Sequence, residues 1–332
     1  MLTTAVQFSA PRTVELTQIE LPPIAEGQAL VRVLFSGISG GTETLAYRGE
    51  IDPSLPLDET LGSLAGTFSW PFRYGYSAVG TVEQSRCSLP EGALVFCFHP
   101  HQAHLVCSGA EVIAIAGIDA RSATLLPLVE TALQISLDAG AVAHQPVVVV
   151  GLGAVGILTG ALLARAGAVV IGSDPLPGRR SAAESFSVSS VRPGDLPARI
   201  ADLTAGRGVP LVVEASGSPR ALSEVLDLVG HEGTVLVASW YGTKPVSLPL
   251  GGAFHRRRLT LRSTQVSTIP ARLASTWSIE RRRDTVLHLM RELPLKRLAT
   301  HEFPLSQAPA AFQAVDSASD DLIHAALTYA ED

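Results

Sequence analysis

Cysteine is scarce in this chain, because Cys87, Cys97 and Cys107 are the only three in 332 residues. An odd number of cysteines in a chain of this length is not typical of a disulfide framework. They recur every ten residues, whereas structural zinc sites use closely spaced cysteine pairs. We therefore expect free thiols in a reducing compartment, which indicates a cytoplasmic protein.

Charged residues are also few, at 17%, while hydrophobic residues make up 46%. This balance excludes a disordered chain and is sufficient for the cores of two domains. The net charge is −6, and no long basic arm is present, so nucleic acid is not an expected partner. The arginine runs 256–258 and 281–283 are short. They indicate a solvated face, or, beside His255, a contact for an anionic substrate group.

The sequence has no basic region followed by an apolar run at its beginning, so we expect no signal peptide. Residues 147–164 are uncharged and have the hydropathy of a membrane span. The glycines in this segment follow a run of four valines and precede a stretch of small residues. This order indicates a buried strand, a turn and a helix, and we expect no membrane partner.

Strand and helix signals divide the sequence into two parts. Short alternating apolar runs, broken by glycine and proline, predict an irregular and mostly antiparallel β domain over 1–115. A helix is expected over 120–140, and strands alternate with helices from Pro146 onward. This alternation predicts an α/β fold with a doubly wound parallel sheet. We assign 1–120 and 267–332, including a late strand near 322–328, to the β domain and 121–266 to the nucleotide-binding domain.

A glycine-rich turn follows the valine run. Gly151, Gly153 and Gly156 form the spacing G-x-G-x-x-G, and Ala154 and Val155 begin the next helix. The first glycine makes a tight turn, the second lets a pyrophosphate approach the backbone, and the third brings helix and strand close together. The helix N-terminus offers free N–H groups to the phosphates. The sequence therefore predicts a dinucleotide site; the alternative is a glycine-rich turn without a ligand.

An acidic residue at the end of the next strand favours NAD. Asp174 lies 23 positions after Gly151, where a carboxylate accepts hydrogen bonds from the ribose and repels a 2′-phosphate. Arg179 and Arg180 follow, and an arginine there can instead accommodate the 2′-phosphate of NADP. We predict NAD and keep NADP as the alternative.

Two later strand ends are predicted to border the cofactor, since ligands of such sheets lie beyond the carboxyl ends of the strands. The first is Glu214 to Gly217, with Ser216 as the cofactor contact, and the second is Ala238 to Gly242, with Ser239. Trp240, in the second, is a candidate substrate contact. The alternative for each is an ordinary loop residue.

Together these landmarks resemble the medium-chain dehydrogenase/reductase superfamily, over essentially the whole chain. The matching motifs are S-G-I-S-G-G-T-E (36–43), Y-G-Y-S-A-V-G (74–80), P-E-G-A-L-V-F (90–96), the unit 147–174 and V-V-E-A-S-G (212–217). The resemblance implies a GroES-like β domain, a Rossmann domain and hydride transfer to or from a nicotinamide cofactor.

The sequence differs from the zinc-dependent members of that family at the positions of their zinc ligands. Ser39 stands where they carry a zinc-binding cysteine, and Tyr76 stands where they carry a zinc-binding histidine. Hydroxyl groups are poor zinc ligands beside thiolate and imidazole. The lobe for structural zinc is missing between Phe98 and His104. The chain is similar to a zinc-free branch with Gly-Ile-Ser-x-Gly-Thr-Glu, which includes bacteriochlorophyllide dehydrogenases, so we expect no zinc.

Without zinc, side chains must handle the proton of the substrate hydroxyl. The resemblance places Ser39, Thr42, Tyr76 and His99 near the nicotinamide, and we predict them as the catalytic residues. A histidine with a pKa near neutrality suits acid–base work. The alternatives are a core tyrosine at 76 and a packing histidine at 99.

Three further side chains complete the predicted site. Glu43 and Glu130 are candidate substrate contacts; Glu43 is also suited to tying its own loop to a basic group, and Glu130 to holding a cationic or polyhydroxy substrate. His99 and His101 would share one side of a strand and offer a metal pair, but Pro100 interrupts the strand and no acid or thiol lies beside them.

The leading prediction is therefore a zinc-independent, NAD(H)-dependent alcohol dehydrogenase or carbonyl reductase acting on a small molecule. The alternatives are an NADPH-dependent quinone or enoyl reductase and a dinucleotide-binding protein without catalysis. The resemblance also implies a homodimer, paired through an edge strand at 234–239.

Overall fold

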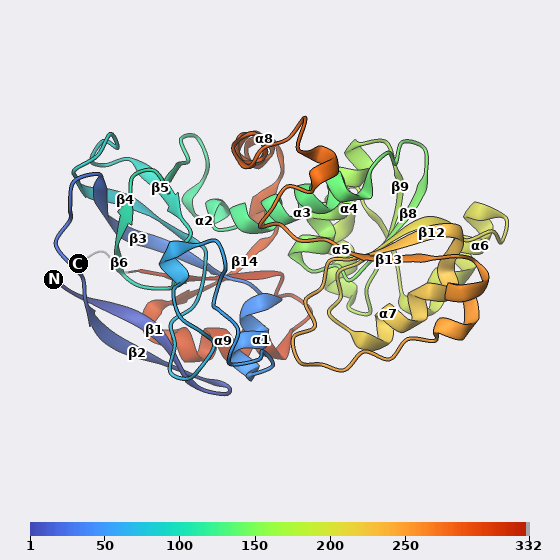
Figure 1. Cartoon of the computed structure of the whole chain (residues 1–332), viewed down its shortest axis with the longest axis horizontal. Helices are drawn as coiled ribbons and strands as arrows, with labels where there is room; N and C mark the ends of the chain where they lie inside the picture. The colour runs from blue at the N-terminus through green and yellow to red at the C-terminus, as the bar shows by residue number, and fades with distance from the viewer. Residues whose placement is uncertain (330–332) are drawn as a thin grey trace. The chain divides into compact units, whose positions relative to one another are not determined.

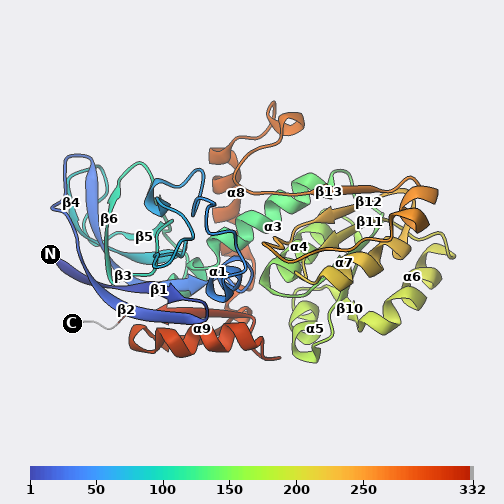
Figure 2. The same cartoon turned by 60° about the horizontal axis from the view of Figure 1, so that its bottom comes forward.

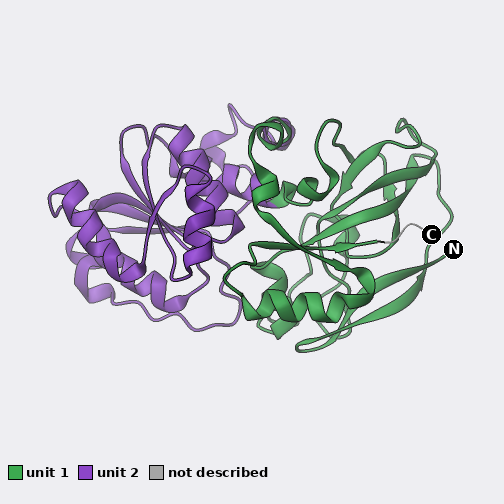
Figure 3. Ribbon diagram, turned by 180° about the vertical axis from the view of Figure 1, so that it is seen from behind, with its two compact units in different colours: residues 1–127, 287–332 green, residues 128–286 purple. Residues whose placement is uncertain are grey.

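The computed structural model describes residues 1–329 and divides the chain into two compact units. Unit 1 comprises Met1–Pro127 and Leu287–Asp332, and unit 2 comprises Leu128–Val286 (Figure 3). The sheets and the hydrophobic cores of the two units are separate.

Unit 2 is built on a six-stranded parallel sheet, whose strands are labelled in Figure 1. The strands are β8 (Pro146–Val150), β9 (Val169–Ser173), β10 (Ser189–Val191), β11 (Val209–Glu214), β12 (Val229–Val237) and β13 (Thr260–Ser263). Their order is β10-β9-β8-β11-β12-β13. The direction of strand addition reverses between β8 and β11, which is the topological switch point where doubly wound sheets bind ligands.

The sequence explains why β8 lies in the middle of this sheet. Its valines at 147–149 are fully buried, as expected for a strand covered on both faces. Four helices that follow strands of this sheet are α4 (Ala154–Arg165), α5 (Pro177–Glu184), α6 (Leu196–Thr204) and α7 (Pro219–Val225). The uncharged segment 147–164 is thus strand β8, a turn and most of α4, as predicted. Within residues 1–329, every helix is too short or too polar to cross a bilayer.

Unit 1 contains a seven-stranded sheet and a two-stranded sheet. The first joins β3 (Gln28–Ile38), β4 (Ala78–Ser85), β5 (Leu94–Cys97), β6 (His104–Ser108), β7 (Ile113–Ala114), β14 (Ala299–Pro304) and β15 (His324–Thr328). The second joins β1 (Leu2–Ala10) and β2 (Thr13–Glu20). The late strand predicted near 322–328 is β15, and it pairs with β3 antiparallel.

Three shorter helices and two longer helices complete the elements that position the site. They are α1 (Thr42–Arg48), α2 (Ala120–Ala123), α9 (Ala308–Ser317), α3 (Leu126–Ala139) and α8 (Ile279–Glu292). Figure 2 shows α9 running beside β2, and the ring of Phe312 in α9 contacts Phe8 and Tyr47. The predicted α/β fold, with an irregular β part and a doubly wound parallel sheet, is confirmed.

Polar contacts hold together the segments on each side of the division between the units. Arg121 donates hydrogen bonds to the carbonyls of His301 and His324, which ties residues 120–127 to the C-terminal strands. Arg282 bonds to Glu130, and Arg272 to Asp138, which ties the segment up to 286 to α3. The sequence-based boundaries were 120/121 and 266/267, whereas the units divide at 127/128 and 286/287.

The predicted edge strand is wrong. Residues 234–237 belong to β12, which pairs with β11 on one side and with β13 on the other. The edge of the parallel sheet is β13, a strand of four residues. Short edge strands expose few unpaired backbone groups.

Candidate functional site

The glycine turn lies at the switch point of the sheet in unit 2. Gly151 has a φ of +92°, and a Cβ there would lie 2.5 Å from the backbone of Ser216. A Cβ at Gly156 would lie 1.8 Å from the carbonyl oxygen of Gly151. A Cβ at Gly153 would meet nothing within 4 Å. The first and third glycines are therefore needed by the fold, whereas the second leaves an open approach to the backbone.

This difference yields a prediction about Gly153. Replacing Gly153 with Ala should leave the melting temperature within about 2 °C of wild type, because its φ of −69° suits alanine and its surroundings are open. The same replacement should weaken NADH binding about tenfold or more, since the methyl group occupies the approach to the backbone. Gly156→Ala is the contrasting variant and should lower the melting temperature. NADH fluorescence titration and thermal unfolding measure both; unchanged NADH affinity in Gly153→Ala would contradict a phosphate at this turn.

Asp174 connects the glycine turn to the end of β9. It is 3% exposed; Oδ2 accepts from the Leu152 N–H at 2.8 Å, and Oδ1 accepts from the Leu176 N–H at 2.9 Å. The Nη1 atom of Arg179 lies 3.9 Å from Oδ2, and its Nε is buried without a hydrogen-bond partner. Arg180 instead donates to the carbonyls of Asp174 and Pro175. The buried Nε of Arg179 is thus a donor without a partner beside the Asp174 carboxylate.

The two predicted strand ends of unit 2 lie together. The Glu214 side chain is fully buried and accepts from the N–H of Ser216 at 2.7 Å and from the Tyr241 hydroxyl at 2.6 Å. Ser239 Oγ accepts from the Gly217 N–H at 2.8 Å. These bonds join the ends of β11 and β12, beside the glycine turn that Ser216 contacts. Trp240 follows Ser239 and is 43% exposed.

Unit 1 brings three of the four predicted catalytic residues together. Burial, and then the nearby Glu43 carboxylate, raise the pKa of the Tyr76 phenol to about 12, and side-chain hydrogen bonds with Ser39 and Thr42 lower it by less. We call Ser39, Thr42 and Tyr76 the hydroxyl cluster. Its phenol is protonated at neutral pH, so it can donate a hydrogen bond or a proton.

A chain of buried polar groups lies behind the hydroxyl cluster. Glu43 is fully buried; Oε1 accepts from the Ser39 N–H at 2.9 Å, and Oε2 lies 2.7 Å from Nε2 of His101. The other ring nitrogen of His101 lies 2.7 Å from Ser36 Oγ, which lies 2.7 Å from the Tyr329 hydroxyl. Every ring nitrogen and carboxylate oxygen in the Glu43–His101 pair thus has a partner, as buried polar groups require.

The Glu43–His101 pair also contacts the segment that carries Tyr76. Gly75 has a φ of +122°, and a Cβ there would lie 2.7 Å from the His101 ring. The imidazole therefore packs directly on the backbone that precedes Tyr76, while Glu43 holds the backbone of Ser39. Glu43 is thus a positioning residue for the hydroxyl cluster, in agreement with the prediction that it ties its loop to a basic group.

The surroundings and the pKa of His99 differ from those that the sequence predicted. It lines a cavity of unit 1 whose lining includes none of Ser39, Thr42 and Tyr76. Burial and the charge of Arg73 lower the pKa of His99 to about 4, so the expected pKa near neutrality is wrong. Its ring is neutral at pH 7, with Nδ1 3.2 Å from the Pro100 carbonyl oxygen.

The structure also argues against the predicted roles of Glu130 and of the histidine pair. Glu130 is 4% exposed, and its Oε1 lies 3.1 Å from Nε of Arg282. Its carboxylate is therefore already paired with a cation of the protein. Residues 98–103 lie between β5 and β6 rather than on a strand, so the alternation that would align His99 with His101 is absent. Within residues 1–329, no group of three or more His, Cys, Asp or Glu side chains is arranged to hold a metal ion.

Sequence reasoning missed Ser36 and Tyr329, and it did not pair Glu43 with His101. Ser36 and Tyr329 are 293 positions apart, and Glu43 and His101 are 58 apart. No local pattern signals such contacts. The sequence did offer one clue, because Glu43, His101 and Gly75 all lie close in the sequence to predicted catalytic residues.

Comparison with known proteins supports a relationship to dehydrogenases. Residues 154–279 match the family described as zinc-binding dehydrogenase. The 2-desacetyl-2-hydroxyethyl bacteriochlorophyllide A dehydrogenase of Cereibacter sphaeroides is 28% identical over 97% of both chains. The D-guloside 3-dehydrogenase of Escherichia coli is 25% identical over 85% of this chain and 86% of that protein. The chain is therefore similar to dehydrogenases over most of its length, and residues 154–279 match the zinc-binding dehydrogenase family.

Solved structures share the fold. An alcohol dehydrogenase of Escherichia coli CFT073 in complex with NADH has a TM-score of 0.77 and 14% identity, over 98% of this chain and 99% of that one. A zinc-binding dehydrogenase of Sinorhizobium meliloti bound to NADP has a TM-score of 0.75 and 18% identity, over 99% of both chains. At these identities the likeness concerns the fold alone.

Proposed function

We propose that this protein is an NAD(H)-dependent oxidoreductase that interconverts an alcohol and its carbonyl compound. The observation that carries the proposal is the open glycine turn at the switch point, with Asp174 bonded to it. The homologues support the same chemistry, because the relatives described above are dehydrogenases of hydroxyl-bearing substrates by name.

The residues of unit 2 fit a dinucleotide. Gly153 leaves room for a pyrophosphate at the backbone, and α4 begins at the next residue with free N–H groups. Each oxygen of the Asp174 carboxylate accepts one backbone N–H and has capacity for a second donor such as a ribose hydroxyl, and the unpartnered Nε of Arg179 is a donor beside it. The bound nicotinamide would accept or supply the hydride.

The hydroxyl cluster supplies the proton in this proposal. Because the pKa of Tyr76 is about 12, the phenol remains protonated and donates to the oxygen of a carbonyl substrate as charge develops there. Ser39 and Thr42 hold the phenolic oxygen in place. These properties favour the reduction of a carbonyl compound at neutral pH.

We further propose that this reaction needs no zinc. The support is the chemistry of the donors: Ser39 and Tyr76 carry hydroxyl groups at the positions where the resemblance implies thiolate and imidazole. Both are already engaged in one hydrogen-bonded cluster. The residues present therefore do not fit a catalytic zinc ion.

Cofactor titration tests the proposal. We expect NADH to bind about tenfold or more tightly than NADPH, because the buried Asp174 carboxylate repels a 2′-phosphate. Tighter binding of NADPH, lost in Arg179→Met, would instead support the alternative quinone or enoyl reductase. Cofactor binding without turnover of any alcohol or carbonyl compound would support the non-catalytic alternative.

The proposal extends to the cellular compartment and the oligomeric state of the protein. We propose a cytoplasmic protein, since its three cysteines are free. We also propose a homodimer, now paired through the exposed edge strand β13 instead of 234–239. Light scattering at the mass of a 34.8 kDa monomer would contradict the dimer.

A further inference from the structure

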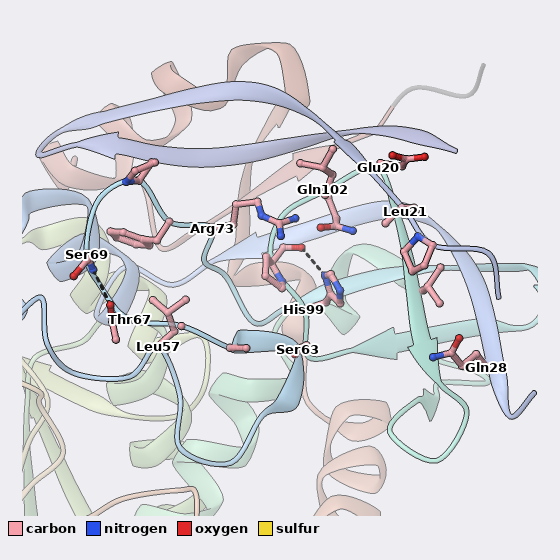
Figure 4. Close-up of a pocket in the computed structure, with 18 residues that line it drawn as sticks. Glu20, Leu21, Gln28, Leu57, Ser63, Thr67, Ser69, Arg73, His99 and Gln102 are labelled. Carbon is pink, nitrogen blue, oxygen red and sulfur yellow. Dashed lines mark hydrogen bonds between the residues drawn. The ribbon is translucent and has the colours of Figure 1, made fainter. Parts of the chain in front are cut away.

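Unit 1 contains an open cavity of about 490 Å³ that is separate from the hydroxyl cluster. Figure 4 shows its lining, which comes from the end of β2, the first residue of β3, the segment 57–73, the segment 99–102 and strand β6. The lining includes Glu20, Leu57, Phe72, Arg73, His99 and Gln102. The volume is in the range of sites that enclose small molecules, which is roughly 300–1,000 Å³.

Arg73 gives the cavity a cation without a protein partner. Within residues 1–329, its guanidinium has no hydrogen bond or ion pair. In Figure 4 the guanidinium points toward Gln102, and Glu20, the acid of the lining, lies beyond Gln102 with its carboxylate directed away. An unpaired guanidinium beside an enclosed space is a binding group for a carboxylate or a phosphate.

The wall beside Arg73 offers hydrogen-bond acceptors. Gln102 is 1% exposed; its Nε2 donates to the His104 carbonyl at 2.6 Å, and its Oε1 is buried without a partner. His99 is neutral because burial and the Arg73 charge lower its pKa, and its Nδ1 bonds to Pro100, so Nε2 is left as an acceptor. These acceptors require donors such as ligand hydroxyls.

Apolar side chains complete the lining. Leu57 and Phe72 are both buried and face the cavity together with Arg73. They suit the carbon skeleton of a short chain or a sugar ring, while the charge and the acceptors lie at one end. The cavity thus combines one cationic group, at least two acceptors and an apolar surface.

We propose that this cavity binds a small polyhydroxy acid, with its anionic group at Arg73 and its hydroxyl groups at Gln102 and His99. The site is distinct from the hydroxyl cluster and does not require the proposed dehydrogenase activity. The anionic group is a carboxylate or a phosphate, which Arg73 recognises by the same fork geometry.

Calorimetric titration of the full chain tests this site. The probes are D-gluconate, D-glucose 6-phosphate and the uncharged sorbitol. We expect at least one acid to bind, and sorbitol to bind about tenfold or more weakly, since it cannot pair with Arg73. Binding of gluconate alone assigns a carboxylate, binding of the phosphate alone assigns a phosphate, and binding of both assigns charge as the shared feature. Binding of neither acid overturns the proposal.

Two variants locate the binding. Arg73→Met should weaken binding of the acid about tenfold or more, and the exposed position of Arg73 should leave the fold intact. Tyr76→Phe should leave the affinity unchanged, because Tyr76 does not line the cavity. Equal loss in both variants would place the acid at the hydroxyl cluster, and unchanged affinity in Arg73→Met would exclude this cavity.

An independent readout uses His99. Binding of an anion beside Arg73 should offset its positive charge and raise the pKa of His99 from about 4. Imidazole NMR signals, assigned with His99→Asn, report this change. A His99 pKa that stays constant at saturating acid would overturn the proposed location.

Discussion

Replacing Tyr76 with Phe should lower kcat for reduction of a carbonyl substrate by about 10²–10⁴-fold, while the Kd for NADH remains unchanged. The reason is that the Tyr76 phenol is the protonated donor of the hydroxyl cluster, whereas the cofactor residues lie on other elements. Steady-state kinetics and NADH fluorescence measure the two quantities separately.

Tyr74→Phe is the matched control for this variant. Tyr74 is buried, its ring contacts the ring of Tyr76, and it takes no part in the cluster of hydrogen bonds. We expect its removal to change kcat less than about threefold, the scale of a conservative change outside the reacting groups. Equal losses in the two variants would show that Tyr76 acts through packing and not through its hydroxyl.

The pH profile provides a second check on the same assignment. Tyr76 donates its proton, and its pKa is raised to about 12, so its contribution to reduction should be lost only as the pH rises toward that value. The pKa of His99 is lowered to about 4, so His99 should contribute no inflection above pH 6. An inflection near pH 6.5 that disappears in His99→Asn would restore His99 as a catalytic residue.

Replacing Glu43 with Leu should lower the free energy of unfolding of unit 1 by about 3–5 kcal/mol. Both Glu43 and His101 are fully buried, and the substitution leaves a ring nitrogen of His101 and the Ser39 N–H without acceptors. Urea unfolding measures the loss, and Glu15→Gln, at an exposed position of β2, serves as the control.

Glu43→Gln separates the charge of Glu43 from its hydrogen bonds. The amide can retain contacts with Ser39 and His101, so we expect a smaller loss of stability than in Glu43→Leu. Removal of the negative charge should also lower the pKa of Tyr76 below about 12, because the Glu43 carboxylate raises it. Tyrosine ¹³C NMR measures this pKa. An unchanged pKa would show that Glu43 is not electrostatically coupled to the hydroxyl cluster.

The parallel-sheet half of the fold could be predicted largely from the sequence. Val147 to Gly156 encode a buried strand, a tight turn and a helix by local rules of periodicity and backbone freedom. Asp174 could be identified because its spacing from the turn is set by one helix and one strand. Signals of this kind act over about 30 residues, within a single βαβ unit.

The predictions that failed all depended on distant partners. The strand 234–239 was expected at an edge, but β13 pairs beside it. Glu130 was expected to meet a substrate, but Arg282 occupies it from 152 positions away. His99 was expected to titrate near neutrality, but burial and Arg73 lower its pKa. A sequence pattern shows which groups are present, not which charges fold against them.

The sequence by itself determined the type of fold, the glycine turn and the hydroxyl groups at 39, 42 and 76, because these features depend on residue type and local spacing. Only the tertiary structure decided that the hydroxyl cluster is supported by the buried Glu43–His101 pair and that Arg73 opens onto a separate cavity. Burial and electrostatic potential arise when segments far apart in the chain come into contact, and they set the protonation state of Tyr76 and His99.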